Sequence, residues 1–145
     1  MTVQDKIERE IIIDAPLERV WALVSEPGWW IGDGDRSCQR RSKEGDLDII
    51  EDPRYGRFPL QTVAIEPLRY ISFRWVMESA KEGEPVPATT LVEFWVETDE
   101  RGTRVVVVES GFASLPNAEA ALADNTEGWK FQMDVLKANA ERVTI

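Results

Sequence analysis

The sequence predicts an α+β protein in which a curved antiparallel sheet of about six strands wraps around a long C-terminal helix. Three observations support this fold class. Strand-like segments follow one another through the middle of the chain, with turn residues between them. A short helical pattern follows the first strand. The C-terminal part carries a long amphipathic pattern, whose apolar stripe needs a partner as large as the sheet.

Length and composition are typical of a single globular domain over residues 1–145. Hydrophobic residues make up 43% and charged residues 30%, which excludes disordered chains and membrane bundles. A net charge of −10 argues against nucleic acid and membranes as partners, because both are negatively charged. No apolar signal segment opens the sequence, and Cys38 is its one cysteine, so we expect a cytoplasmic protein.

The first strand and the short helix are predicted within residues 7–24. Isoleucine-rich residues 7–13 form a strand with one buried face. Asp14 is a candidate helix cap, and Pro16 suits the first helical turn, where its missing N–H costs nothing. The helix then presents one apolar stripe, formed by Leu17, Val20, Trp21 and Val24.

Five more strands are predicted, at residues 46–51, 58–65, 70–77, 91–97 and 103–110. Turn residues between them favour short hairpins and an antiparallel meander, with a longer hairpin loop at 80–87. The alternation of side chains predicts inner and outer faces for the last two strands. The inner set is Val92, Phe94, Val96, Val105, Val107 and Glu109, and Trp95 lies on the outer face.

The long helix is predicted from a capping pattern and a periodic apolar face. Asp124, with Glu127 three residues later, resembles a capping box. Apolar residues then recur at helical spacing, at Trp129, Met133, Leu136, Ala140 and Val143.

Several separated segments resemble the Hsp90-ATPase-activator-homologue-like domains of the START-like, Bet v 1-like superfamily. The resemblance lies in Glu109-Ser110-Gly111-Phe112, in Asn125 and Gly128-Trp129 with Met133 and Leu136, and in residues 11–21 and 69–75. It implies a helix-grip fold with a cavity between the sheet and the long helix. It implies no shared catalytic residue, because members of this superfamily differ in function. Residues 29–35 depart from the family pattern.

Aromatic side chains are the main candidates for a ligand site. Six tryptophans are many for this length, and their rings supply large apolar walls. The candidate cavity residues are Trp29, Trp30, Phe73, Trp75, Phe94, Glu109, Phe112, Trp129 and Met133. Core packing is the alternative for the aromatic residues, and of Trp29 and Trp30 we expect one to cover the cavity mouth, as a lid or as a plug. Glu109 is either a polar anchor for a ligand or the partner of an arginine such as Arg74 or Arg104.

The sequence gives little support for a catalytic site or a metal site. Histidine, the usual general base, is absent, so we assign no catalytic residue. Asp33-Gly34-Asp35 resembles the start of a calcium loop, but Cys38 stands where that loop needs glycine, so we expect no metal. We expect no cofactor either, because no complete dinucleotide or phosphate motif is present.

Three functions remain as hypotheses. The first is a binding module for an apolar or amphipathic small molecule, oriented by Glu109. The second is a protein-interaction or co-chaperone-like module, in which the exposed Trp95 contacts a protein partner or a second copy of the chain. The third and least favoured is a cavity enzyme that uses Glu109 as its acid or base.

Overall fold

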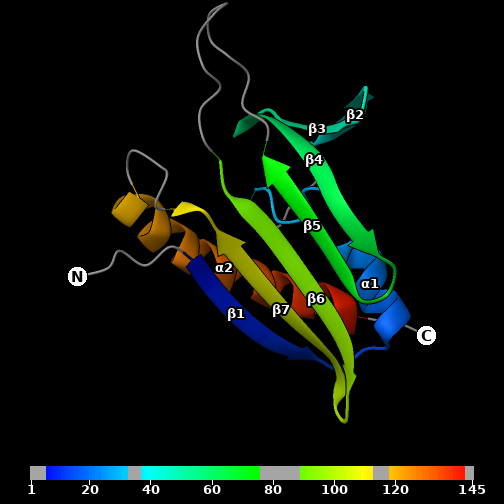
Figure 1. The fold of residues 1–145 in the computed structure, drawn as a ribbon. Helices are drawn as coiled ribbons and strands as arrows, with labels where there is room; N and C mark the ends of the chain where they lie inside the picture. Colours follow the sequence, from blue (N-terminus) through cyan, green and yellow to red (C-terminus); the bar gives the residue numbers. More distant parts are fainter. Residues whose placement is uncertain (1–5, 33–36, 76–88, 113–117, 143–145) are drawn as a thin grey trace, which may run out of the picture.

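The fold was analysed in a computed structural model that describes residues 6–32, 37–75, 89–112 and 118–142. Seven strands form one antiparallel sheet in the order β1-β7-β6-β5-β4-β3-β2 (Figure 1). The strands are β1 (Lys6–Ile13), β2 (Arg40–Glu44), β3 (Leu47–Asp52), β4 (Gly56–Glu66), β5 (Tyr70–Trp75), β6 (Leu91–Asp99) and β7 (Gly102–Ser110). The helices are α1 (Leu17–Val24) and α2 (Ala118–Glu141).

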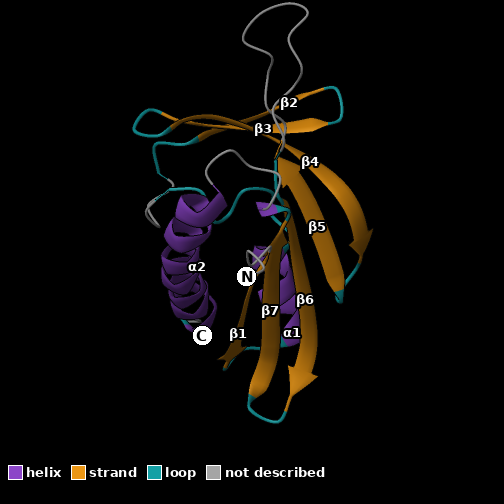
Figure 2. Ribbon diagram, turned by 60° about the vertical axis from the view of Figure 1, so that its left-hand side comes forward, coloured by secondary structure: helices purple, strands orange, loops and turns teal. Residues whose placement is uncertain are grey.

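The two helices lie on the same side of the sheet. Figure 2 shows α2 running along the sheet, and it contacts β1, while α1 contacts α2, β6 and β7. A register shift between Thr62 and Ala64 interrupts the pairing of β4 with β5, and such a bulge bends a strand. This architecture is the helix-grip fold that the sequence predicts.

The core lies between the helices and the inner face of the sheet. On β7, and on β6 as far as Val96, every second residue is buried, which confirms the predicted inward alternation. On α2 the predicted apolar face is also buried: Trp129, Met133, Leu136 and Ala140 are each at most 4% exposed. The inner face of the sheet and one face of α2 therefore bury one another.

Two differences from the predicted elements have physical reasons. The prediction of about six strands omitted β2, because its sequence is polar and all five residues are exposed, so it shows no alternation. Helix α2 begins at Ala118 and not near Asp124, since the alanine-rich segment before Asp124 continues the helix. Strand β5 is described to Trp75, and residues 80–87 and Val143 lie outside the described part of the chain.

The start of α1 also differs from the expectation. Its N-cap is Pro16, and no side chain caps it, so Asp14 does not have the predicted role. The backbone N–H of Asp14 instead donates to Glu141 Oε2 at 2.7 Å, which ties the end of β1 to the end of α2. The guanidinium of Arg19 also reaches α2, where its Nε donates to the carbonyl oxygen of Ala140 at 2.7 Å.

A tight turn after α1 brings two tryptophans into the core. Gly28 has a φ of 70°, and a Cβ there would lie 2.8 Å from Ile50 Cδ1, so the turn requires glycine. The N–H of Ile31 donates to the carbonyl of Gly28 at 3.0 Å and closes the turn. As a result, Trp29 and Trp30 are both only 7% exposed.

Candidate functional site

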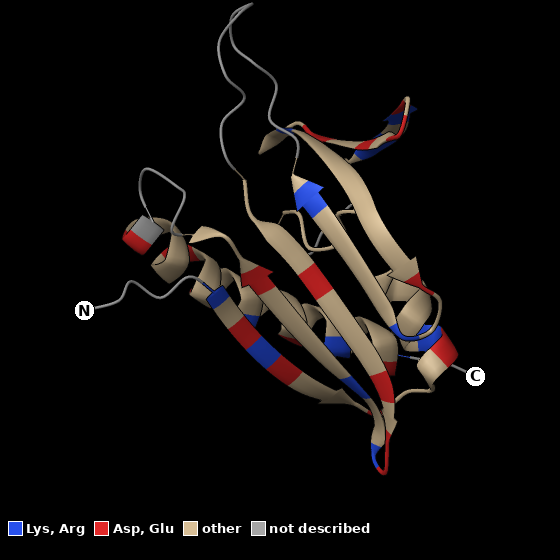
Figure 3. Cartoon of the chain, in the orientation of Figure 1, with Lys and Arg blue, Asp and Glu red and all other residues tan. Residues whose placement is uncertain are grey.

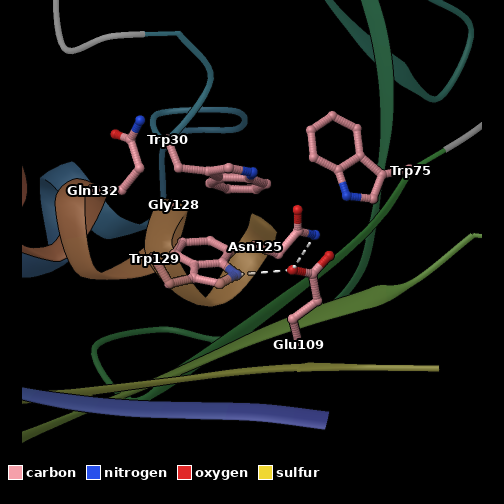
Figure 4. A pocket seen from close by; sticks show the side chains of 7 residues that line it. All are labelled: Trp30, Trp75, Glu109, Asn125, Gly128, Trp129 and Gln132. Carbon is pink, nitrogen blue, oxygen red and sulfur yellow. Dashed lines mark hydrogen bonds between the residues drawn. The ribbon is translucent and has the colours of Figure 1, made fainter. Parts of the chain in front are cut away.

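A small pocket lies between α2 and the inner face of the sheet. Its volume is about 180 Å³. The lining residues come from the turn after α1, from β5, from β7 and from α2: Trp30, Trp75, Glu109, Asn125, Gly128, Trp129 and Gln132 (Figure 4). Gly128 is exposed to solvent while it lines the pocket, so the pocket reaches the surface beside it.

Glu109 is the one ionisable side chain among these lining residues, and it is 3% exposed. Its Oε1 accepts hydrogen bonds from Trp129 Nε1 at 2.8 Å and from Asn125 Nδ2 at 3.0 Å. Its Oε2 accepts one from the hydroxyl of Thr90. Because three donors hold the carboxylate, its position is fixed at the end of the pocket formed by β7.

No described lysine or arginine forms an ion pair with Glu109. Of the two arginines that the sequence suggested, Arg104 pairs with Glu10 and Glu97, with N···O distances of 2.6 Å for both. Arg74 Nη1 donates to the carbonyl of Thr89 at 3.5 Å. Among the described residues, the hydrogen-bond donors to the buried Glu109 carboxylate are all neutral, so a pocket occupant would meet a carboxylate with no cationic partner among them.

Tryptophan rings form the walls of the pocket. The ring centroid of Trp30 lies 5.8 Å from that of Trp129 and 5.9 Å from that of Trp75, with Trp75 nearly perpendicular to it. Figure 4 shows the indole nitrogen of Trp30 on the side of its ring that faces Asn125 and Trp75. That nitrogen is buried and has no hydrogen-bond acceptor among the described residues.

Two glutamines hold the Trp30 segment against the rest of the site. Gln132 Nε2 donates to the carbonyl of Gly32 at 2.7 Å, and Gln39 Nε2 donates to the carbonyl of Ile31 at 2.9 Å. The same Gln39 nitrogen lies 3.2 Å from Asp52 Oδ2. Hydrogen bonds from the Arg54 side chain hold the pKa of Asp52 at about 2, against its ordinary value near 3.9.

The structure divides the nine candidate residues into two groups. Four line the pocket: Trp30, Trp75, Glu109 and Trp129. The other five, Trp29, Phe73, Phe94, Phe112 and Met133, lie in the hydrophobic core and do not line this pocket. Of the two alternatives for Trp29 and Trp30, a lid or a plug, the burial of both rings favours the plug.

Sequence reasoning identified Glu109 but missed Asn125 and Gln132 as pocket residues, and Thr90 as the partner of Glu109. Asn125 and Gln132 lie four residues before and three residues after Trp129, so helical spacing places both on its face. Thr90 lies two residues before Val92, so the alternation of β6, continued backward, points it inward to Glu109. Apolar periodicity reports only the apolar residues of a face, so it did not reveal the polar residues beside them.

Other sequence-based candidates lie outside this pocket. Asp33 and Asp35 fall outside the described residues, and no cluster of possible metal ligands occurs within the described ones. Cys38 is an exposed free thiol. No helix in the described ranges is long and apolar enough to cross a membrane.

Solved structures share this fold over nearly the whole chain. The protein MLL2253 from Mesorhizobium loti matches with a TM-score of 0.73 and 19% identity, over 97% of this chain and 99% of that one. The protein BH1534 from Bacillus halodurans matches with a TM-score of 0.68 and 21% identity, over 97% and 100%. The Aha1 dimer from Colwellia psychrerythraea matches with a TM-score of 0.69 and 16% identity, over 96% and 98%.

Sequence comparison identifies the family. Comparison with curated proteins gives no match. A family model described as Activator of Hsp90 ATPase homolog 1-like protein matches residues 14–141. This range includes both helices and all strands except β1. The chain therefore belongs to the Activator of Hsp90 ATPase homolog 1-like family.

Proposed function

We propose that this protein is a binding module for a small molecule of about one ring in size, held in the pocket between α2 and the sheet. The observation that carries the proposal is the buried Glu109 carboxylate at the end of a tryptophan-walled pocket. A concave, mostly apolar site with a few fixed polar groups is the usual form of a ligand site.

The size of the pocket limits the ligand. Large rings from the sheet, the turn and α2 already fill most of the space under the helix, as the packing of Trp29, Phe94 and Trp129 shows. The remaining 180 Å³ is below the volume of sites for drug-sized ligands. A dry cavity of about 150 Å³ binds benzene, so one ring is the appropriate scale.

Gly128 lies on α2 at the point where the pocket reaches the surface. A glycine inside a helix costs about 1 kcal/mol of stability relative to alanine. Gly128 has no positive φ, and a Cβ there would meet no atom of the described residues within 4 Å. A small side chain at this position therefore meets no obstacle, whereas a large one would occupy the space at the pocket mouth.

Blocking the mouth at Gly128 tests the proposal. Single-ring fragments are screened for binding by saturation-transfer NMR against the native protein, Gly128→Leu and Gly128→Ala. We expect fragments that bind the native protein to lose at least tenfold in affinity with Gly128→Leu, because the leucine fills the mouth. Gly128→Ala is the matched control: it should keep binding and raise stability by about 0.5–1 kcal/mol. No binding fragment, or equal binding to the leucine variant, would contradict the proposal.

A second candidate function is protein interaction through the outer face of the sheet. Trp95 is 37% exposed there, and a hollow of about 580 Å³ is lined by residues of β1, β6 and β7 that include Trp95, Val106 and Val108. Figure 3 shows both signs of charge along β1 and acidic residues on β6. Exposed tryptophans are enriched at protein interfaces, and one structural neighbour is described as a dimer.

The same geometry weakens the enzyme hypothesis. Glu109 already accepts three hydrogen bonds, and the described residues that line the pocket include no serine, cysteine, lysine or histidine. Glu109 therefore has no nucleophile among the lining residues to activate. A carboxylate fixed by neutral donors suits the orientation of a ligand better than nucleophilic chemistry.

A further inference from the structure

The unpartnered indole N–H of Trp30 indicates which chemical group the pocket receives. Trp30 is 7% exposed, its nitrogen is buried, and no described residue offers that nitrogen an acceptor. Its N–H side faces the pocket in Figure 4. A buried donor without a partner is costly, so an occupant that supplies an acceptor at this point gains a hydrogen bond that the protein lacks.

The opposite side of the pocket offers hydrogen-bond acceptors. Glu109 accepts three hydrogen bonds, whereas an ionised carboxylate offers about four acceptor positions. Asn125 gives its amide N–H to Glu109, so its amide oxygen faces away, toward the space between Trp30 and Trp75 (Figure 4). An occupant that carries an N–H beside its acceptor therefore meets Trp30 on one side and Asn125 or Glu109 on the other.

Charge decides between the remaining ligand classes. An anion supplies an acceptor to Trp30 but would also face the Glu109 carboxylate, which has no cationic partner among the described residues. An amidinium or ammonium ion satisfies Glu109 but has no acceptor for Trp30. An uncharged group with a carbonyl next to an N–H meets both requirements.

We propose that the pocket binds an uncharged, planar, single-ring compound that carries an amide or lactam, with its carbonyl on Trp30 Nε1 and its N–H toward Asn125 and Glu109. This inference rests on the proposed function, because it assigns the ligand class of the same pocket. The flat tryptophan walls and the volume of about 180 Å³ favour one planar ring over a chain or a larger ring system.

Three probes of nearly equal shape separate the classes. Benzamide is neutral with an acceptor and donors, benzoate is an anion with acceptors only, and benzamidinium is a cation with donors only. Each is titrated into ¹⁵N-labelled protein, and the six tryptophan indole signals are followed by NMR. We expect benzamide to bind at least tenfold more tightly than the other two and to shift the Trp30 indole signal downfield.

Two adjacent tryptophans provide a matched pair of variants. Trp29 and Trp30 are equally buried and both lack an acceptor among the described residues, but only Trp30 lines the pocket. Trp30→Phe keeps a ring and removes the N–H, so benzamide should bind about three- to tenfold more weakly. Trp29→Phe should leave the affinity unchanged. Circular dichroism confirms that both variants fold.

The outcomes separate this inference from the proposed function. Preference for benzoate or benzamidinium, or equal loss of benzamide affinity in Trp29→Phe and Trp30→Phe, overturns the amide assignment and leaves the pocket as a binding site. If none of the three probes binds, but other fragments bind and Gly128→Leu blocks their binding, only the amide assignment is overturned. If no fragment binds in a way that Gly128→Leu blocks, both proposals are overturned.

Discussion

At the scale of single residues, two buried carboxylates have opposite environments. Asp52, 3% exposed, is held by the guanidinium of Arg54, whose Nη2 lies 3.1 Å from Asp52 Oδ2. Glu109, equally buried, is held by neutral donors from the described part of the chain. The Asp52 carboxylate is paired with a cation and stabilises the fold, whereas the Glu109 carboxylate interacts with whatever enters the pocket.

The environment of Asp52 predicts a specific pH dependence of stability. Arg54 lowers the pKa of folded Asp52 to about 2, below its value near 3.9 in an unfolded chain. The contribution of Asp52 is therefore complete above about pH 4 and is lost as the pH falls toward 2. In urea unfolding, Asp52→Asn should be less stable than the native protein at pH 7, and the difference should shrink between pH 4 and 2.

The neighbouring Glu51 supplies the control for this prediction. It is exposed on the same strand, β3, and Glu51→Gln removes the same formal charge. The stability difference between Glu51→Gln and the native protein should be small at pH 7. If the difference for Asp52→Asn stayed constant down to pH 2, the Arg54 contact would not be what stabilises ionised Asp52.

At the scale of elements, α2 shows which residues of a buried face apolar periodicity predicts and which it does not. The spacing of Trp129, Met133 and Leu136 predicted the buried face of α2, because a helix repeats its faces every three to four residues. It did not predict that Asn125 and Gln132 share this face, since polar residues carry no apolar signal. Strand β2 was missed for a related reason: both of its faces are exposed, so pairing with β3, and not burial, defines it.

Truncation of Trp129 tests the packing of α2 against the sheet. Trp129 is 4% exposed, contacts the rings of Trp29, Trp30 and Phe94, and donates to Glu109. Trp129→Ala leaves a cavity and removes a donor from a buried carboxylate, so it should lower the free energy of unfolding by about 3–5 kcal/mol. Phe131 lies two residues along α2 and is 48% exposed, so Phe131→Ala should cost less than about 0.5 kcal/mol. Equal losses in chemical denaturation would show that α2 presents a different face to the sheet.

At the scale of the whole molecule, the fold was more predictable than the site. Alternation in β6 and β7 and the apolar face of α2 each report which side of an element is buried, and together they define a sheet that covers a helix. The pocket depends instead on where separate elements meet. Trp30 reaches the pocket because the turn at Gly28 folds back over Ile50. Glu109 reaches the pocket because it lies near the end of β7. The meeting of these two segments leaves no periodic pattern in the sequence.

The outer face of the sheet determines how the molecule would associate. Trp95 is an exposed tryptophan there, and its ring lies 5.1 Å from that of Tyr70, whose hydroxyl donates to Glu93 Oε2 at 2.7 Å. This contact holds Trp95 in place on the surface, which lowers the entropy cost of burying it against a partner.

Trp95→Ser should therefore disturb self-association more than stability. If two copies of the chain pair through this face, the dissociation constant measured by sedimentation equilibrium should rise at least tenfold, because a central tryptophan typically contributes 2 kcal/mol or more to an interface. Phe131→Ser is the control, since Phe131 is a similarly exposed aromatic residue on α2, away from the outer face of the sheet. A monomeric native protein at all concentrations would exclude the homodimer, and equal weakening by both substitutions would place the interface elsewhere.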